Sequence, residues 1–261
     1  MQEFPPLDLS AVVTTLRAAG CVFAEDEAGL LLSTADGPAE LAAMVERRAA
    51  GLPLEHVLGW AEFCGLRIAV DPGVFVPRRR TEFLVGQAAA LAPERAVVVD
   101  LCCGSGALGA ALTASLPGAE LHAADVEPAA VRCARRNVGD RGTVYEGDLF
   151  EPLPRSLRGR VDVLLANVPY VPTGDVALLP PEARIHEPRV ALDGGGDGLD
   201  VMRRVAAEAA SWLAPGGSLL VEASERQAAR AQEALRGSGL IPRVVVSEEW
   251  YATVVIGTRP R

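Results

Sequence analysis

The sequence lacks an apolar stretch long enough to cross a membrane, which would need about 20 consecutive apolar residues. Its first residues, Met1 to Pro6, lack the basic start and the apolar run of a secretion signal. There is no Cys-x-x-Cys pair among its five cysteines, and its three histidines are isolated from one another. These absences favour a cytoplasmic protein with reduced cysteines and no bound metal.

Basic residues are scarce relative to acidic ones, with 25 Lys and Arg against 34 Asp and Glu and a net charge of -9. A protein whose main partner is a phosphate backbone normally presents a basic face. The charge therefore argues against nucleic acid as a partner. What the sequence does have is length and apolar content. Its 261 residues, 49% of them hydrophobic, can form one large domain or a small domain beside a medium one.

The first 56 residues have the periodicity of short amphipathic helices. Apolar side chains recur at helical spacing from Leu9 to Leu16, and further segments of this kind lie at residues 30–32 and 36–51. From residue 57 the pattern changes to short β-type runs broken by glycine and proline. We therefore predict an N-terminal helical domain over residues 1–56, a β-rich linker over residues 57–76 and a larger domain over residues 77–261.

Strand and helix patterns alternate along the predicted larger domain. The predicted strands are residues 97–101, 120–124, 143–145, 161–166, 218–222, 243–247 and 253–258. The helices predicted between them are residues 108–116, 128–137, 199–213 and 225–235. Apolar strands separated by helices indicate a doubly wound α/β fold with a mostly parallel seven-stranded sheet. No helix separates the last two strands, so the final strand is expected to pair antiparallel.

Residues 100–109, Asp-Leu-Cys-Cys-Gly-Ser-Gly-Ala-Leu-Gly, follow a predicted strand and open a predicted helix. This places them at the carboxyl edge of the sheet, where open α/β folds bind ligands. Gly104, Gly106 and Gly109 form the pattern Gly-x-Gly-x-x-Gly, in which backbone amides can approach a bound group. That pattern alone suits either a dinucleotide or S-adenosyl-L-methionine. We interpret Cys102 and Cys103 as packing residues and not as nucleophiles.

Acidic residues end the first three predicted strands. Asp100 would repel a pyrophosphate but attract the α-ammonium group of S-adenosyl-L-methionine, which favours that cofactor over NAD. Asp125 is placed to accept both ribose hydroxyls, and Asp148 to accept the adenine amine while Leu149 covers the ring. Each acid taken alone could be a solvated loop residue or a helix cap. Three together indicate a cofactor site, which we predict to comprise Asp100, Cys102, Cys103, Gly104, Ser105, Gly106, Asp125, Val126, Asp148, Leu149 and Asn167.

The fourth predicted strand is followed by Asn167-Val168-Pro169-Tyr170, again at the carboxyl edge of the sheet. The tetrapeptide resembles the (N/D)PPY motif of methyltransferases that act on amide or exocyclic amine nitrogens. The resemblance implies that the Asn167 side-chain oxygen and the Val168 carbonyl accept the two N–H groups of the target. Tyr170 would pack on the planar acceptor, and Pro169 would restrict the turn. The alternative interpretation is an ordinary Asn-x-Pro turn.

Longer segments resemble the HemK/PrmC family of protein-(glutamine-N5) methyltransferases. These segments are residues 53–59, residues 73–78 with Thr81-Glu82, residues 187–195 and residues 197–200. The resemblance implies a class I, Rossmann-like methyltransferase fold, S-adenosyl-L-methionine as cofactor and a glutamine of a peptide-chain release factor as acceptor. It also implies that the helical domain helps to bind the protein substrate. Two other hypotheses stay open: methylation of another planar nitrogen, on a small molecule or a different protein, and a cofactor-binding interaction protein without transfer activity.

The chain departs from the family pattern at three places. Val168 stands where the motif has its first proline, so one fixed φ angle is lost although the carbonyl remains. Cys102 replaces a glycine, a change that the loop tolerates if Cys102 keeps a negative φ. Arg79 and Arg80 replace a proline and a carboxylate, which either alters the acceptor or makes a solvated basic turn.

Overall fold

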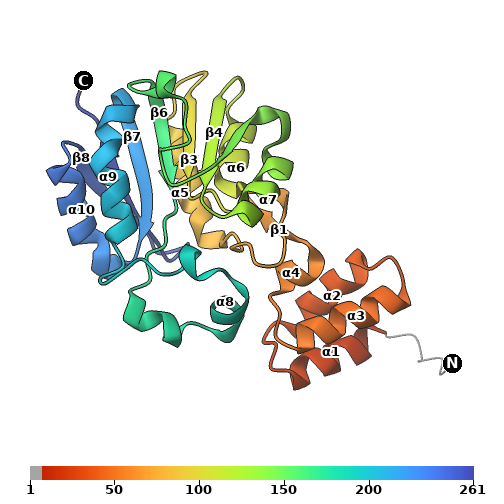
Figure 1. The fold of residues 1–261 in the computed structure, drawn as a ribbon. Coiled ribbons are helices and arrows are strands. Elements are labelled where there is room, and N and C mark those ends of the chain that lie inside the picture. Colours follow the sequence, from red (N-terminus) through yellow and green to blue (C-terminus); the bar gives the residue numbers. More distant parts are fainter. Residues whose placement is uncertain (1–7) are drawn as a thin grey trace.

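A bundle of short helices stands beside a helix-covered sheet in the computed structural model, which describes residues 8–261 (Figure 1). The bundle contains α1 (Leu9–Ala18), α2 (Ala24–Thr34), α3 (Pro38–Ala49) and α4 (Leu54–Leu58). α1 begins where the Asp8 side chain accepts a hydrogen bond from an amide of the first turn, and α3 begins with Pro38, which needs no amide partner there. Leu31 and Met44 lie in its apolar core. The sequence predicted three helices and missed α4, which is too short to show a helical period.

An antiparallel hairpin connects the bundle to the sheet. It consists of β1 (Trp60–Phe63) and β2 (Leu66–Ala69), joined by a turn in which Cys64 and Gly65 have positive φ angles. The predicted β-rich linker at residues 57–76 contains this hairpin, although α4 extends across its first boundary. The division of the chain at residues 56 and 76 stays a prediction.

The main sheet has seven strands in the order β5-β4-β3-β6-β7-β9-β8. Its strands are β3 (Val97–Leu101), β4 (Glu120–Asp125), β5 (Gly142–Glu146), β6 (Val161–Ala166), β7 (Leu213–Ala223), β8 (Ile241–Ser247) and β9 (Ala252–Thr258). β3 to β7 run parallel, whereas β9 pairs antiparallel with both β7 and β8. The predicted mostly parallel seven-stranded sheet is therefore confirmed. Strand order reverses between β3 and β6, where a doubly wound fold opens a crevice for ligands.

Helices cover both faces of this sheet. α5 (Glu82–Leu91), α6 (Ala107–Ser115) and α7 (Pro128–Val138) share one apolar core with Val98. α9 (Asp200–Trp212) and α10 (Ala228–Gly237) share the other core with Val99. Successive residues of a strand point to opposite faces, so a strand covered on both sides reads as a continuous apolar run.

The segment between β6 and α9 leaves the sheet and lies below its carboxyl edge, next to the helical bundle (Figure 1). It contains the short helix α8 (Pro181–His186). Short 3-10 helices occur at Arg79–Thr81, Gly139–Arg141, Arg155–Leu157, Thr173–Leu178, Arg189–Ala191 and Glu225–Gln227.

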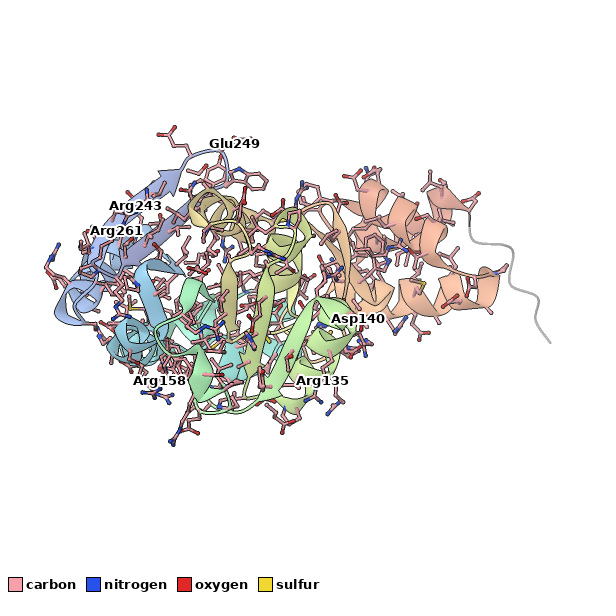
Figure 2. All side chains as sticks on the ribbon, turned by 90° about the horizontal axis from the view of Figure 1, so that it is seen from above. Arg135, Asp140, Arg158, Arg243, Glu249 and Arg261 are labelled. Carbon is pink, nitrogen blue, oxygen red and sulfur yellow. The ribbon has the colours of Figure 1, made fainter. Side chains whose placement is uncertain are left out.

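Most charged side chains lie on the outside of the molecule, and Asp100 and Glu222 are among the few that are buried. Figure 2 shows Arg135, Arg158, Arg243 and Glu249 pointing away from the sheet domain, with the helical bundle to one side. Within residues 8–261, no helix is both long enough and apolar enough to span a membrane.

Candidate active site

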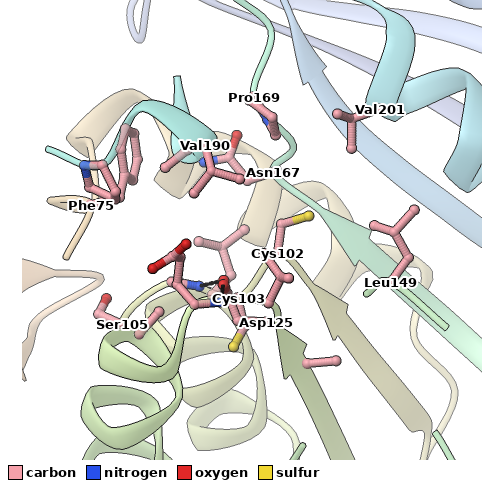
Figure 3. A pocket seen from close by; sticks show the side chains of 18 of the residues that line it. Phe75, Cys102, Cys103, Ser105, Asp125, Leu149, Asn167, Pro169, Val190 and Val201 are labelled. Atoms are coloured by element: carbon pink, nitrogen blue, oxygen red, sulfur yellow. Dashed lines mark hydrogen bonds between the residues drawn. The ribbon is translucent and has the colours of Figure 1, made fainter. Parts of the chain in front are cut away.

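The loops after β3, β4, β5 and β6 meet at one edge of the sheet because these strands are parallel. Leu101, the last residue of β3, is paired with Ala124 of β4 and with Ala166 of β6. The glycine-containing loop after β3 and the loop that begins at Asn167 therefore leave the sheet side by side. A cavity lies between them (Figure 3).

Most of the predicted cofactor residues line this cavity. Figure 3 shows Asn167 and Pro169 on one side, with Ser105 and Asp125 on the opposite side. The predicted residues on its wall are Cys102, Cys103, Gly104, Ser105, Asp125, Val126, Asp148, Leu149 and Asn167. The cavity therefore joins residues from the ends of four different strands.

Asp125 anchors the glycine-containing loop. One of its carboxylate oxygens accepts a hydrogen bond from the Gly104 amide at 2.8 Å, and the other accepts from the Glu127 amide at 2.9 Å. Burial raises the pKa of Asp125, while the hydrogen bonds from these amides work in the opposite direction. Each oxygen keeps a lone pair for a further donor, so Asp125 can hold the loop and also accept from a ligand.

Two predicted cofactor residues, Asp100 and Gly106, do not lie on the cavity wall. Asp100 is only 1% exposed, and its carboxylate accepts a hydrogen bond from the Gly109 amide at 2.9 Å beneath the first turn of α6. Gly106 has a φ of 76°, and a Cβ atom there would lie 3.1 Å from the Cβ of Ala134 on α7. Glycine at this position therefore allows close packing of the loop on α7.

The condition under which Cys102 would replace glycine without strain, a negative φ, is not met, because its φ is 53°. This is the left-handed region that glycine occupies freely and that strains other residues by about 1 to 3 kcal/mol. Neighbouring hydrogen bonds hold the loop in this shape: the Cys103 amide donates to the Ala124 carbonyl, and the Gly106 amide donates to the Cys103 carbonyl. Burial raises the pKa of both the Cys102 and the Cys103 thiol, which disfavours thiolate chemistry there.

The Asp148 carboxylate is held by Arg204 of α9, whose Nη2 lies 2.6 Å from its Oδ2. Both side chains are about half exposed and both line the cavity. Leu149, which follows Asp148, is buried with a φ of 48° and turns its side chain into the same wall. An acidic acceptor and an apolar surface therefore lie next to each other.

A second cavity adjoins the first. The two share Phe75, Asn167 and Ala191, so these residues form the boundary between them. The second cavity extends from Val168 and Tyr170 to Pro53 and Glu55 of the helical bundle and to Leu179, Pro180 and Glu182 around α8. It therefore lies between the sheet edge, the bundle and the α8 segment.

Two acceptor atoms at this boundary have no hydrogen-bond partner among residues 8–261. The buried Oδ1 atom of Asn167 makes no hydrogen bond with any residue in the described part of the chain. Within residues 8–261, the Val168 carbonyl likewise accepts no hydrogen bond. Buried acceptors are nearly always satisfied in folded proteins, because an unpaired one is costly. Because these two acceptors belong to neighbouring residues, they point to a ligand with two N–H groups.

The Tyr170 hydroxyl is fixed between two charged groups. It accepts a hydrogen bond from Arg80 at 2.5 Å and donates one to Glu222 at 2.9 Å. Burial and the Glu222 carboxylate raise the pKa of Tyr170 to about 12, so the hydroxyl stays protonated at neutral pH. The Tyr170 carbonyl accepts from the Gln227 side chain at 2.8 Å. The tetrapeptide is thus held at both its backbone and its ring.

Ion pairs surround the second cavity. Arg78, which follows the predicted linker, contacts both carboxylate oxygens of Glu187, at 2.7 and 2.6 Å. Arg48 of α3 pairs with Glu27 inside the bundle and reaches across to Glu182 of α8 at 2.7 Å. These pairs connect Arg78 and the bundle to the two ends of α8.

Sequence reasoning missed cavity residues that come from distant segments. These are Phe75 at the end of the predicted linker and Pro77 just after it, Pro188, Val190 and Ala191 after α8, and Val201 and Arg204 of α9. Phe75 and the residues after α8 lie in segments that resemble the family, and that resemblance could have identified them. Nothing local to Arg204 marks it, because its place depends on how α9 packs on the sheet.

Comparison with known proteins gives consistent matches. Residues 65–199 match the family model described as Methyltransferase small domain. The release factor glutamine methyltransferase of Geobacter sulfurreducens is 46% identical over 197 residues, covering 73% of this chain and 68% of that protein. The one from Mycolicibacterium smegmatis is 40% identical over 250 residues, covering 88% of each chain. A solved methyltransferase from Pyrococcus furiosus has a TM-score of 0.57 at 16% identity, covering 76% of this chain and 90% of its own, and shows the same fold.

Proposed function

The chain belongs to the release factor glutamine methyltransferase family, and from this premise we propose that it methylates the side-chain amide of a glutamine in a peptide-chain release factor. Its methyl donor is S-adenosyl-L-methionine, which when bound supplies an electrophilic methyl group. The buried Oδ1 atom of Asn167, which has no hydrogen-bond partner among residues 8–261, is the observation that carries the proposal.

The residues of the first cavity suit this cofactor. Asp125 offers carboxylate oxygens to the two ribose hydroxyls, and Asp148 offers one to the adenine amine beside the apolar cover of Leu149. Arg204 holds Asp148 in place for this contact. Asp100 lies behind the wall, so we assign it an indirect role: it fixes the start of α6 through the Gly109 amide.

The acceptor chemistry explains why two neighbouring oxygens matter. An amide nitrogen is a poor nucleophile because its lone pair is delocalised into the carbonyl group. Hydrogen bonds from both of its N–H groups, to Asn167 Oδ1 and to the Val168 carbonyl, would orient the amide and stabilise the positive charge that develops on nitrogen during transfer. A glutamine amide carries two N–H donors, which matches two unpaired acceptors.

The second cavity suits a protein substrate. Its walls include residues of the helical bundle and of the α8 segment, and it opens onto Asn167. We propose that the glutamine-bearing loop of the release factor enters here, so that the bundle contributes to substrate binding. We also propose a cytoplasmic location, which the five free cysteines favour.

The test is transfer of a labelled methyl group to a purified release factor and to its Gln→Ala variant. We expect label on the glutamine-containing protein alone. The Asn167→Ala enzyme should lower kcat by about 100-fold, the size of effect seen when one preorganised hydrogen-bonding group is removed. Its affinity for the cofactor, measured by calorimetry, should change far less.

Equal labelling of both release factors would contradict transfer to the glutamine. If the natural enzyme labels both release factors and the Asn167→Ala enzyme labels neither, the protein is a methyltransferase whose acceptor is another nitrogen. Cofactor binding without any label would favour an interaction protein.

A further inference from the structure

Arg80 lies at the centre of a hydrogen-bonded clamp on the acceptor tetrapeptide. Its Nη2 atom donates to the Tyr170 hydroxyl at 2.5 Å, and its Nε atom donates to Glu222 Oε1 at 2.9 Å. The Tyr170 hydroxyl donates to the same Glu222 oxygen at 2.9 Å. Three groups therefore close a ring of hydrogen bonds, and two of them are charged, which makes such bonds stronger than neutral ones.

The clamp rests on a rigid base. Glu222 belongs to β7, which lies between β6 and β9 inside the sheet, and is 4% exposed. Its second oxygen accepts from the Thr81 hydroxyl at 2.6 Å, so both oxygens are occupied. Arg80 is itself less than half exposed, which reduces solvent screening of the pair. The Tyr170 ring is therefore tied to a strand and not to a mobile loop.

Val168 is the place where the tetrapeptide lacks a constraint. Proline fixes φ, and valine leaves it free. Within residues 8–261, the Val168 amide donates no hydrogen bond, so a proline ring would remove no contact there. Val168 is also buried in an apolar cluster, where a ring of similar size can be accommodated.

We propose that Arg80 is a positioning residue of the acceptor site, which fixes the Asn167–Tyr170 loop by clamping Tyr170 and so replaces the ring constraint that Val168 lacks. Asn167 Oδ1 and the Val168 carbonyl are then held in place for the amide. The two departures from the family motif, at residues 80 and 168, form one compensated pair. The catalytic part of this inference rests on the proposed function.

A double-mutant cycle tests this coupling. Arg80→Gln is made in the natural chain and in a Val168→Pro chain, and Arg79→Gln serves as the matched control. Arg79 is the neighbouring exposed arginine, and its side chain makes no hydrogen bond or ion pair with residues 8–261. Each protein is assayed for kcat and KM with the release factor and for amide hydrogen exchange in the peptide that spans residues 167–173.

In the natural chain, Arg80→Gln should lower kcat about tenfold with a smaller change in KM, and should speed exchange in the peptide by a similar factor. In the Val168→Pro chain, the same change should have an effect of about twofold or less, because the ring already limits the loop. Arg80→Lys should recover part of the kcat loss, since an ammonium group can replace one of the two hydrogen bonds. Arg79→Gln should alter neither readout.

If Arg80→Gln lowers kcat equally in the natural and the Val168→Pro chains, the inference is overturned. An exchange rate that Arg80→Gln leaves unchanged would also overturn it. If the natural enzyme transfers no methyl group to the release factor, the proposed function fails, and the exchange data alone still decide the clamp. If Val168→Pro does not fold, Tyr170→Phe takes its place. Without the hydroxyl, Arg80→Gln should cause no further increase in exchange, and an additional increase would contradict the clamp.

Discussion

Asp100 is a carboxyl group buried beneath α6, with Asp125 nearby. Burial raises the pKa of Asp100 to about 7, and the Asp125 charge acts in the same direction, while the hydrogen bond from Gly109 opposes both. The ordinary value is 3.8, which applies to the unfolded chain. The folded protein therefore binds one more proton than the unfolded chain between these two values.

The difference in proton binding determines how the free energy of unfolding changes with pH. Because the folded state holds the extra proton, the free energy of unfolding should fall as pH rises from about 4 to about 7. At roughly 1.4 kcal/mol per pKa unit, the loss approaches about 4 kcal/mol. Asp100→Asn should remove this part of the pH dependence. Urea unfolding at pH 5 and pH 7.5 measures this pH dependence. Glu249→Gln, an exposed change in the turn between β8 and β9, is the control. Equal pH dependence in the natural and Asp100→Asn proteins would show that the carboxyl titrates normally.

At the scale of structural elements, the glycine-rich loop at residues 194–198 packs against the acceptor tetrapeptide and supports it. Gly198 has a φ of 78°, and a Cβ atom there would lie 2.3 Å from the Tyr170 carbonyl oxygen and 2.4 Å from the Gln227 side-chain nitrogen. Those are the two atoms of the hydrogen bond that holds Tyr170. A side chain at residue 198 would therefore separate them.

Gly198→Ala should destabilise the protein by about 2 to 4 kcal/mol, through backbone strain and the lost hydrogen bond. Methyl transfer should fall more than cofactor affinity does. Gly196→Ala is the matched control, since Gly196 lies in the same loop with open space around its Cβ position and no positive φ. Denaturation and transfer assays on both variants measure the effect. Equal stability and equal methyl transfer of the Gly198→Ala and Gly196→Ala variants would mean that the loop moves freely away from Tyr170.

Elements with a strong local pattern could be predicted from the sequence. The bounds of β3 and β6 agree with prediction because each is a mostly apolar run, and β6 is followed directly by the polar Asn167. α5 was missed, since its residues are apolar on nearly all sides and show no helical period. α8 was missed because it has only six residues and begins at the second of two consecutive prolines.

The site was predictable where residues follow strand ends. Asp125, Asp148 and Asn167 were placed in this way, and all three line the cavity. Asp100 also follows this rule, but the start of α6 covers it. Arg204 and the clamp formed by Arg80 depend on contacts between distant segments, which a local pattern does not contain.

At the scale of the whole molecule, Arg48 joins the helical bundle to the sheet domain. Its guanidinium group is buried, contacts Glu27 and the Leu52 carbonyl within the bundle, and pairs with Glu182 of α8. Glu182 is half exposed, so the pair contributes little to overall stability. Its effect is to set the distance between the bundle and the α8 segment, on either side of the second cavity.

Glu182→Gln should therefore lower the free energy of unfolding by less than about 1 kcal/mol. If the release factor binds between the bundle and α8, its KM should rise severalfold while kcat stays nearly constant. Glu46→Gln, an exposed change on α3, is the control. Steady-state kinetics and urea unfolding provide the two measurements. A fall in kcat with unchanged KM would instead assign Glu182 to the chemical step.

The sheet order also governs how the chain folds while it is being synthesised. β9 lies between β7 and β8 in space, yet it follows both in the chain. Until β9 leaves the ribosome, β7 has an open edge and β8 has no strand beside it. Unpaired edges can join the strands of other molecules. We therefore expect a stage in which aggregation competes with folding, until residues 252–258 pair with β7 and β8.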